Sequence, residues 1–411
     1  MARLLYLHQH FSTPAGAAGT RSHALARALV RRGHAVTLAT GQWQGAVTGL
    51  SGAFRRGRRQ GPVDGLDVVE FAIPCTNAMG LAARSRAFLA YARRAAGLAL
   101  AGPWDLVIAS STPLTVALPA LAARRLRGTP FLFETRDPWP ELPRALGLRQ
   151  PAALWAMERL ADAACREAAA VVALSEGMAE IARARGGRRV EVVPQGCDLD
   201  LFGPHRAPWR PDAAGSGELL AVYAGTHGTA NGLGLLVAAA RRLHAAGERR
   251  VRLLLVGEGA EKPALLAAAA GLPNITFLDP LPKPALAGLL AGSQVGLLCL
   301  APVAAFAEWT APNKLMDYLA AGLPVLSNLP GEAARVLADG AGETVGPEDA
   351  GALAAALTRL ADAPARRAAM GEAARALALR RFDRRLLAAR FADLVESCLP
   401  APAGAARPAA A

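Results

Sequence analysis

Two glycine-containing turns each follow a strand-like segment and precede a helical one, which suits the binding of an anion or a sugar hydroxyl. Gly16, Gly19 and Thr20 follow the run RLLYLH, and the second turn, after LLAVYAG, contains Gly225, Thr226, His227 and Gly228. Backbone N–H groups at a helix start have no intrahelical partner and point toward such a ligand. A plain connecting turn, with Thr20 as the N-cap of the next helix, explains the first segment equally well.

Charged side chains stand near predicted helix starts in the second half of the chain. Lys314 begins the helix of PNKLMDYLAAG, where an ammonium and the helix amides would face the same anion. Asp317 follows one helical turn later, and a carboxylate can accept hydrogen bonds from two neighbouring hydroxyls. Lys262 after GEGAE and Glu332 in PGEAARV are further candidates. A solvated lysine, or an acid that stabilises a helix N-terminus, is the structural alternative.

A third cluster, Glu134, Arg136 and Asp137, lies in FLFETRDPWP at the end of a predicted strand. In a doubly wound sheet, the carboxyl ends of the strands carry the functional groups. Arg136 could hold a phosphate and Asp137 could contact an acceptor hydroxyl. An internal ion-pair network of one arginine between two acids is the alternative.

The elements that must position these groups alternate between strand and helix along the whole chain, which predicts α/β architecture with parallel sheets. Predicted strands cover 3–8, 34–40, 67–72, 106–110, 131–134, 171–174, 190–194, 219–225, 251–257, 275–278, 295–300 and 324–327. The Pro- and Gly-rich segment 203–217 reads as a linker between two doubly wound domains that face each other across a cleft, 1–202 and 218–380. A last helix, 383–397, would pack back on the first domain, and 401–411 would be a disordered tail.

Composition restricts the class of partner and the compartment. The chain has 411 residues and a net charge of +13, which favours anionic partners. Its five cysteines show no CxxC pair or metal-ligand spacing, and the N-terminus lacks a secretory signal, so a cytosolic protein without a metal or other cofactor is expected. Aromatic residues make up only 5% and no nucleic-acid recognition motif is visible, which argues against nucleic-acid binding.

Basic residues also suggest contact with an anionic membrane. RRGRR at 55–59 is placed in a long loop, and the predicted helix 78–101 carries several arginines beside Leu81, Phe88, Leu89 and Tyr91. These arginines are Arg84, Arg86, Arg93 and Arg94. Such a helix can lie on acidic lipid with its aromatic residues at the interface, although an ordinary solvated face is the alternative.

Several motifs, in order, resemble glycosyltransferase family 4, in particular bacterial enzymes that add N-acetylated amino-sugars such as N-acetyl-fucosamine during surface polysaccharide assembly. They are HQHFSTPAGAAGTRSHALARALVRRGHAVTLAT, FLFETRDPWPE, VEVVPQGCDLDLF, AVYAGTHGTANGL, LLLVGEGAEK and PNKLMDYLAAGLPVLS. The resemblance covers nearly the whole chain and implies a GT-B fold, with the acceptor on the first domain and the nucleotide-sugar on the second.

Residue roles follow from that resemblance. It implies acceptor binding by Gly19, Thr20 and Arg21 and a catalytic centre at Arg136 and Asp137. The implied nucleotide-sugar ligands are Gly225, Thr226, His227, Lys314, Asp317 and Glu332, with Asp317 on the ribose. The DxD of Asp198 and Asp200 falls in a turn that is structural in the family, so no metal site is expected there.

The chain also departs from the family pattern. Many members have a Glu where Asp317 stands and another eight residues earlier, where this chain has Trp309, with Glu308 one place out of register. Many also carry a His at the position of Arg136. The first departure puts a catalytic role of Glu308 in doubt, and the second puts the donor-sugar contact at Arg136 in doubt. Whether Glu134 takes part in catalysis is left open.

The resulting hypothesis is a metal-independent, retaining transferase. It would move an N-acetylated hexose or deoxyhexose from a UDP-sugar to a lipid-linked saccharide on the inner face of the plasma membrane. A nucleotide-sugar epimerase of the same fold is one alternative, and a non-catalytic nucleotide-sugar-binding subunit is the other.

Overall fold

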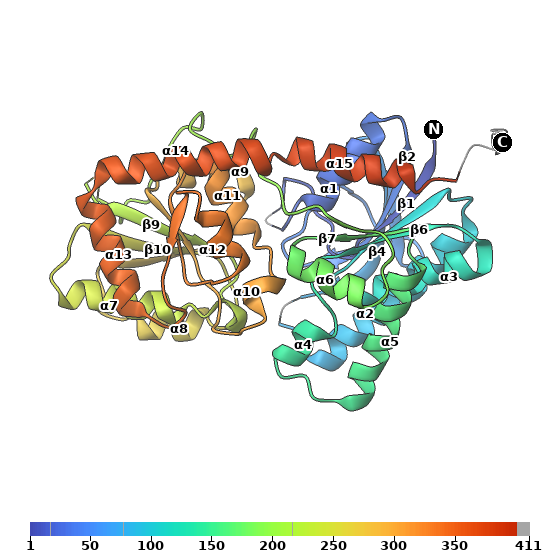
Figure 1. The fold of residues 1–411 in the computed structure, drawn as a ribbon, viewed down its shortest axis with the longest axis horizontal. Helices are drawn as coiled ribbons and strands as arrows, with labels where there is room; N and C mark the ends of the chain where they lie inside the picture. The colour runs from blue at the N-terminus through green and yellow to red at the C-terminus, as the bar shows by residue number, and fades with distance from the viewer. Residues whose placement is uncertain (17, 77, 216, 401–411) are drawn as a thin grey trace, which may run out of the picture.

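The computed structural model describes residues 1–16, 18–76, 78–215 and 217–400 as two α/β domains joined side by side (Figure 1). The predicted α/β fold with two doubly wound domains is confirmed. The predicted disordered tail, 401–411, lies outside the described residues.

The N-domain is built on an eight-stranded sheet in the order β3-β4-β2-β1-β5-β6-β7-β8. All neighbouring strands are parallel except β3, which runs antiparallel to β4. The strands are β1 (Arg3–Leu7), β2 (Ala35–Trp43), β3 (Arg58–Val63), β4 (Leu66–Cys75), β5 (Leu106–Ser110), β6 (Phe131–Thr135), β7 (Ala170–Ala173) and β8 (Val190–Val192).

Helices cover both faces of this sheet because successive strand residues point to opposite sides. Leu4 and Tyr6 of β1 pack on one side, under α1 and α15, while Leu5 and Leu7 pack on the other, against α2, α3 and α5. The helices are α1 (Arg21–Arg31), α2 (Leu81–Ala101), the 3-10 turn η1 (Leu114–Val116), α3 (Ala117–Arg127), α4 (Glu141–Ala145), α5 (Pro151–Glu167), α6 (Glu176–Ala184) and α15 (Arg384–Ser397).

The C-domain has an all-parallel six-stranded sheet in the order β11-β10-β9-β12-β13-β14. Leu220 and Val222 of β9 face α9, α11 and α14, whereas Ala221 and Tyr223 face α7 and α13. The strands are β9 (Leu219–Ala224), β10 (Val251–Val256), β11 (Ile275–Leu278), β12 (Val295–Leu298), β13 (Val325–Ser327) and β14 (Gly342–Thr344). The helices are η2 (Thr229–Asn231), α7 (Gly234–Ala245), α8 (Lys262–Ala268), α9 (Lys283–Ala291), α10 (Phe306–Trp309), α11 (Asn313–Ala321), α12 (Glu332–Leu337), α13 (Ala350–Asp362) and α14 (Pro364–Arg381).

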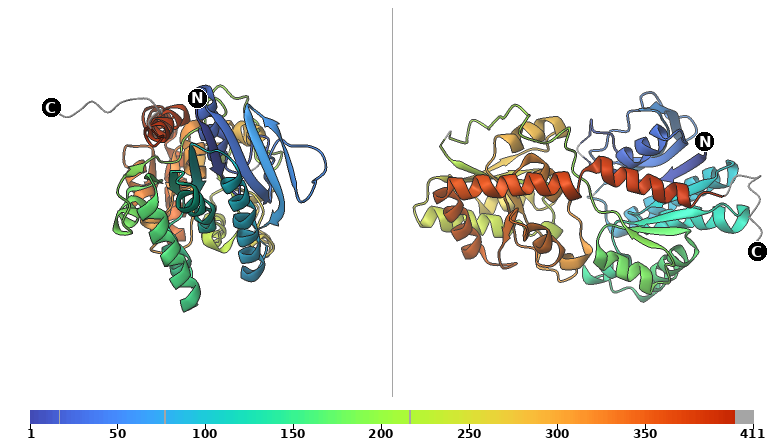
Figure 2. Two further views of the ribbon diagram at one scale, coloured as in Figure 1. Left: turned by 90° about the vertical axis from the view of Figure 1, so that its right-hand side faces the viewer. Right: turned by 45° about the horizontal axis from the view of Figure 1, so that its top comes forward.

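The chain leaves the N-domain after β8 and returns to it after α14, so two segments connect the domains. They are hydrogen-bonded to each other: Cys197 N donates to Phe382 O at 2.6 Å, and Arg384 N donates to Cys197 O at 3.0 Å. Helices α14 and α15 then run nearly end to end across both domains (Figures 1 and 2). Phe391 and Val395 of α15 are fully buried in the N-domain core.

Two edge strands differ from the sequence-based prediction. RRGRR, placed in a loop, instead leads into β3, because Arg59 donates to the buried carboxylate of Glu70 at 2.9 Å and stacks on Phe54. The other strand, β14, has only three residues and completes the far edge of the C-domain sheet. Edge strands need only one paired side and carry little apolar signal, which explains why both escaped prediction.

Candidate active site

Gly225, which has no side chain, and Lys314 lie close together at the end of the first C-domain strand. Gly225 follows β9, and Lys314 reaches it from the first turn of α11. A β-carbon on Gly225 would lie 3.1 Å from Lys314 Cε and 3.1 Å from the Tyr223 hydroxyl. Any side chain at this position would therefore crowd the ammonium, and glycine keeps the approach open.

The Lys314 ammonium is held by neutral oxygen atoms. It donates to the Tyr223 hydroxyl at 2.8 Å and to Asn231 Oδ1 at 2.9 Å, and it lies 4.2 Å from the centre of the Tyr223 ring. No carboxylate within the described part of the chain forms an ion pair with it. Burial therefore lowers the pKa of Lys314 to about 7. A positive charge without a counterion here favours an incoming anion.

Asp317 lies one turn farther along α11 and already has a partner. Its Oδ2 accepts a hydrogen bond from Lys283 Nζ at 2.5 Å, and both side chains are largely buried. Lys283 is the first residue of α9 and was not singled out from the sequence.

Thr226, His227 and Lys262 occupy less direct positions. Thr226 is exposed, and its carbonyl accepts a hydrogen bond from Tyr223 Oη at 2.9 Å. His227 is fully buried, and neither ring nitrogen has a partner among the described residues. Burial and nearby Lys262 lower the pKa of His227 to about 4, so its ring is neutral. Lys262 Nζ forms ion pairs with Glu258 Oε2 at 3.0 Å and with Asp279 Oδ1 at 2.7 Å.

Glu332 and Glu308 share one arginine near the contact between the domains. Arg335 binds Glu308 at 2.5 Å and Glu332 at 2.8 Å. The Arg335 guanidinium lowers the pKa of Glu308, so this acid is ionised. The Glu308 carbonyl accepts from Ser175 Oγ of the N-domain at 2.8 Å. This geometry favours an interdomain contact for Glu308. Glu332 is the first residue of α12, which agrees with the alternative of an acid that stabilises a helix N-terminus, and it also forms an ion pair with Arg335.

In the N-domain, Arg136 follows β6 and is held by a buried histidine. Its Nη1 lies 2.7 Å from His8 Nε2, and its backbone N donates to Ser111 Oγ at 3.1 Å. Burial and Arg136 hold the pKa of His8 well below its ordinary value, so the ring is neutral. Because a guanidinium only donates, Nε2 must accept and Nδ1–H must donate to Ser22 Oγ, 2.7 Å away. His8 therefore fixes the direction in which Arg136 points.

Arg136 and the first glycine turn lie directly opposite the start of α11. A β-carbon on Gly19 would lie 3.4 Å from Asn313 Nδ2 and 3.9 Å from Arg136 Nη2. Asn313 directly precedes Lys314 at the start of α11. The two domains therefore bring Gly19 and Arg136 close to Lys314, at the carboxyl ends of their sheets.

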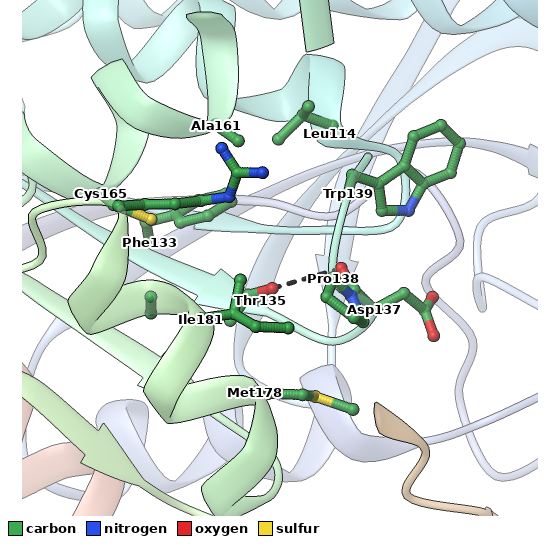
Figure 3. A pocket seen from close by; sticks show the side chains of 12 residues that line it. Leu114, Phe133, Thr135, Asp137, Pro138, Trp139, Ala161, Cys165, Met178 and Ile181 are labelled. Carbon is green, nitrogen blue, oxygen red and sulfur yellow. Dashed lines mark hydrogen bonds between the residues drawn. The ribbon is translucent and has the colours of Figure 1, made fainter. Parts of the chain in front are cut away.

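Asp137 points into a region closed by hydrogen bonds. Its Oδ2 accepts from the Thr112 hydroxyl, and its carbonyl accepts from Thr135 Oγ1 at 3.2 Å. A cavity beside it, lined by Phe133, Trp139 and residues of α5 and α6, measures about 20 Å³ (Figure 3). That volume holds one water molecule but no sugar.

Arg21 and Glu134 form a buried pair beneath the site. Arg21 Nε donates to Glu134 Oε1 at 2.8 Å, and its other nitrogens donate to the carbonyls of Val193 and Pro194. Burial opposes ionisation of Glu134, but Arg21 and Arg136 outweigh it and hold the pKa below its ordinary value. The expected acceptor contact of Arg21 does not fit this geometry, because the side chain is buried and each of its three nitrogen atoms already donates to the protein.

Loss of this pair should destabilise the fold. We expect Arg21→Ala to lower the free energy of unfolding by about 3–5 kcal/mol, because Glu134 would remain buried and charged without its partner. Urea denaturation followed by circular dichroism measures the change. Arg27→Ala, at an exposed position of the same helix, is the control and should stay within about 0.5 kcal/mol of the wild type. Equal stability of the two variants would contradict the structural role.

Thr20 binds the connection between the domains instead of capping α1. Its side chain makes no capping bond, and its hydroxyl accepts from Arg384 Nη1 at 2.6 Å. The same guanidinium lies 3.5 Å from Asp198 Oδ2, while Asp198 Oδ1 accepts from Leu201 N at 3.1 Å. Asp198 thus closes a turn, and no cluster of three potential metal ligands occurs within the described ranges.

Two family models match the chain in succession. Residues 16–196 match a glycosyl transferase 4-like domain, and residues 218–363 match the glycosyl transferases group 1. A comparison with curated proteins finds no match.

Solved structures of low sequence identity share the fold over nearly the full chain. Sucrose-phosphate synthase from Thermosynechococcus elongatus is 17% identical with a TM-score of 0.74, covering 97% of this chain and 99% of that one. HepE from Anabaena in complex with UDP-glucose is 17% identical with a TM-score of 0.67, covering 97% and 100%. The α,α-trehalose 6-phosphate synthase of Burkholderia multivorans is 18% identical with a TM-score of 0.68, covering 97% of each chain.

Fold and domain order together define the class as GT-B glycosyltransferases. Within it, residues 16–196 belong to the glycosyl transferase 4-like domains and residues 218–363 to the glycosyl transferases group 1.

Proposed function

We propose that the chain transfers a sugar from a UDP-linked donor, bound by the C-domain, to an acceptor bound by the N-domain. One observation carries this proposal: Lys314, without a carboxylate partner, faces Gly225 at the end of β9, while Arg136 and Gly19 stand opposite Asn313. Structural neighbours with the same fold are described as complexes with UDP and UDP-glucose, which supports the choice of nucleotide.

The chemistry that this arrangement can perform is stabilisation of a leaving group. Breaking the anomeric bond leaves a nucleoside diphosphate, whose developing charge must be balanced. Lys314 and the amides at the start of α11 supply positive potential from one domain, and Arg136 supplies it from the other. The proposed mechanism therefore uses side chains and helix amides for this charge. Retention at the anomeric carbon is a further part of the proposal and rests on the family resemblance.

The finer assignment rests on the family resemblance. We propose that the sugar is an N-acetylated hexose or deoxyhexose and that the acceptor is a lipid-linked saccharide of surface polysaccharide synthesis. The enzyme would then work on the cytoplasmic face of the membrane. Among the residues that the structure describes, no helix is both long and apolar enough to span a bilayer.

Exposed apolar and basic side chains on one side of the N-domain support a peripheral contact with a membrane. On α2, Leu81 and Leu89 are 69% and 56% exposed, with Arg86 and Arg93 on the same exposed surface, and Trp155 of the nearby α5 is 61% exposed. Both helices project from the same side of the domain (Figures 1 and 2). Phe88 and Tyr91, expected at the lipid interface, instead pack inward.

Charge reversal on α2 should weaken this membrane contact. We expect the double variant R86E/R93E to bind vesicles containing phosphatidylglycerol about tenfold or more weakly, since each basic residue contributes about 1 kcal/mol at an acidic surface. Sedimentation with vesicles, with and without phosphatidylglycerol, measures the partition. The same reversal at Arg241 and Arg242 of α7 is the control and should leave binding unchanged. Equal loss in both variants would argue against a specific α2 surface.

The proposed function is tested with a panel of nucleotide-sugars and purified lipid-linked or soluble saccharide acceptors. Acceptor-dependent release of UDP is the expected result. Conversion of a donor into its epimer without any acceptor would identify an epimerase instead. Tight binding of a donor without either reaction would identify a non-catalytic subunit.

The low pKa of Lys314 predicts how donor binding depends on pH. Bound diphosphate raises that pKa, so above pH 7 binding must take up a proton, and the affinity for UDP should fall about tenfold per pH unit between pH 8 and 9. No neighbour competes in that range: burial raises the pKa of Cys299 to about 12 and keeps that of Tyr223 well above 10, and that of His227 is about 4. Calorimetry in buffers of different ionisation enthalpy measures the uptake, and Lys314→Met should abolish it.

A further inference from the structure

The C-domain holds a buried ion pair one turn beyond the proposed diphosphate site. Lys283 Nζ lies 2.5 Å from Asp317 Oδ2, and the two side chains are 14% and 9% exposed. On its other side the same ammonium lies 5.4 Å from the centre of the Phe202 ring. Phe202 is itself buried in the C-domain core. Lys283 is therefore clamped between an aromatic ring and a carboxylate, with little freedom to turn elsewhere.

The position of Asp317 relative to Lys314 indicates which part of a bound nucleotide would lie next to this ion pair. Residues three apart on a helix share one face, so Asp317 stands about 4.5 Å farther along α11 than Lys314. The ribose of a nucleoside diphosphate is joined directly to the first phosphate. If Lys314 faces the diphosphate, Asp317 is at the right spacing for the ribose hydroxyls.

The ion pair leaves one carboxylate oxygen available. Lys283 engages Oδ2, and Oδ1 receives no hydrogen bond from the residues that the structure describes. A carboxylate has about four acceptor positions, so one partner does not saturate it. The lysine also compensates a charge that would otherwise be costly at this degree of burial.

We propose that Lys283 is a positioning residue that holds Asp317 with Oδ1 turned toward the ribose, and so makes the enzyme select ribonucleotides over deoxyribonucleotides. This inference rests on the proposed function. The short aspartate side chain, with one oxygen fixed and the other free, presents a preorganised acceptor to a hydroxyl donor. Lys283 itself need not touch the nucleotide. Its loss should lower discrimination between sugars of the nucleoside, whereas loss of a merely structural lysine would weaken all nucleotides alike.

The test compares UDP with 2′,3′-dideoxyuridine diphosphate, which lacks both hydroxyls, by calorimetry on the full chain. We expect the wild type to prefer UDP at least about tenfold, as a hydrogen bond to a charged acceptor is lost in the analogue. In Lys283→Met the preference should fall below about threefold. If that variant does not fold, Lys283→Gln serves in its place, and its preference should be at least about threefold lower than that of the wild type.

The chain offers a closely matched control. Lys262 also begins a helix with the sequence KPAL and also binds acidic side chains, Glu258 and Asp279. Lys262→Met should therefore keep the preference of the wild type. An unchanged preference in Lys283→Met, or a wild type that binds both nucleotides equally, would overturn this inference while leaving the donor site intact. A wild type that binds neither nucleotide would overturn the proposed function and this inference with it.

Discussion

Lys314→Met is expected to lower kcat/KM for the nucleotide-sugar by about 10²–10³, the usual cost of removing one group that stabilises charge in a transition state. The ammonium sits beside Gly225 with only neutral oxygens around it. Methionine keeps the length of the side chain but cannot balance the leaving diphosphate. The loss should lower kcat, because the diphosphate gains negative charge as the anomeric bond breaks, and it should lower the affinity for UDP, because that charge is present in the bound product.

Steady-state kinetics and UDP calorimetry on the same preparations measure these two effects. Lys262→Met is the control, since Lys262 is neutralised by Glu258 and Asp279 and should cost less than about threefold. If the two variants lose activity equally, Lys314 has no special role and the proposed donor site is wrong.

Arg136→Met is expected to lower kcat by about 10² or more while the affinity for UDP changes by less than about threefold. Arg136 belongs to the N-domain and meets the donor only where the two domains come together, opposite Asn313. It should therefore act on the transition state more than on the bound nucleotide. This split between kcat and affinity separates its role from that of Lys314.

Arg127→Met, on the exposed end of α3, is the matched control for loss of one N-domain arginine and should keep full activity. Single-turnover measurement of UDP formation after chemical quenching separates the chemical step from product release. A large loss of UDP affinity in Arg136→Met, with kcat unchanged, would instead show that this arginine only binds the nucleotide and does not stabilise the transition state.

The fold was largely predictable because both domains are built from buried parallel strands. Such strands read as apolar runs, and the runs at 106–110 and 251–257 correspond closely to β5 and β10. β3 was missed because RRQGPV is polar and gains its order from Arg59 and Glu70, which belong to different strands. Local pattern carries no signal for such a pairing.

The candidate site was predictable where a local motif marks it and not where distant contacts build it. PNK placed Lys314 at the start of a helix, and FLFETRDP placed Arg136 at a strand end. Tyr223 and Asn231, which hold Lys314, stand 91 and 83 residues before it in the chain. His8 lies 128 residues from Arg136. Only the folded chain brings these partners together.

The same reasoning explains the role of Arg21. Its position beside Gly19 and Thr20 suggested a ligand, yet its partners are Glu134, Val193 and Pro194, between 113 and 173 residues away. Burial of a side chain at a helix start depends on which elements later cover it, and this information is not local to the turn.

The return of the chain to the N-domain has a consequence for the order of events during protein synthesis. α15 covers the apolar side of α1, where Leu25 and Leu29 are buried, and it contributes Phe391 to the same core. Residues 384–397 leave the ribosome only after the whole C-domain has been made. The C-terminal domain can therefore complete its core first, against the usual order in which domains fold from the N-terminus. A chain cut short before Arg384 would lose stability in the domain at its opposite end.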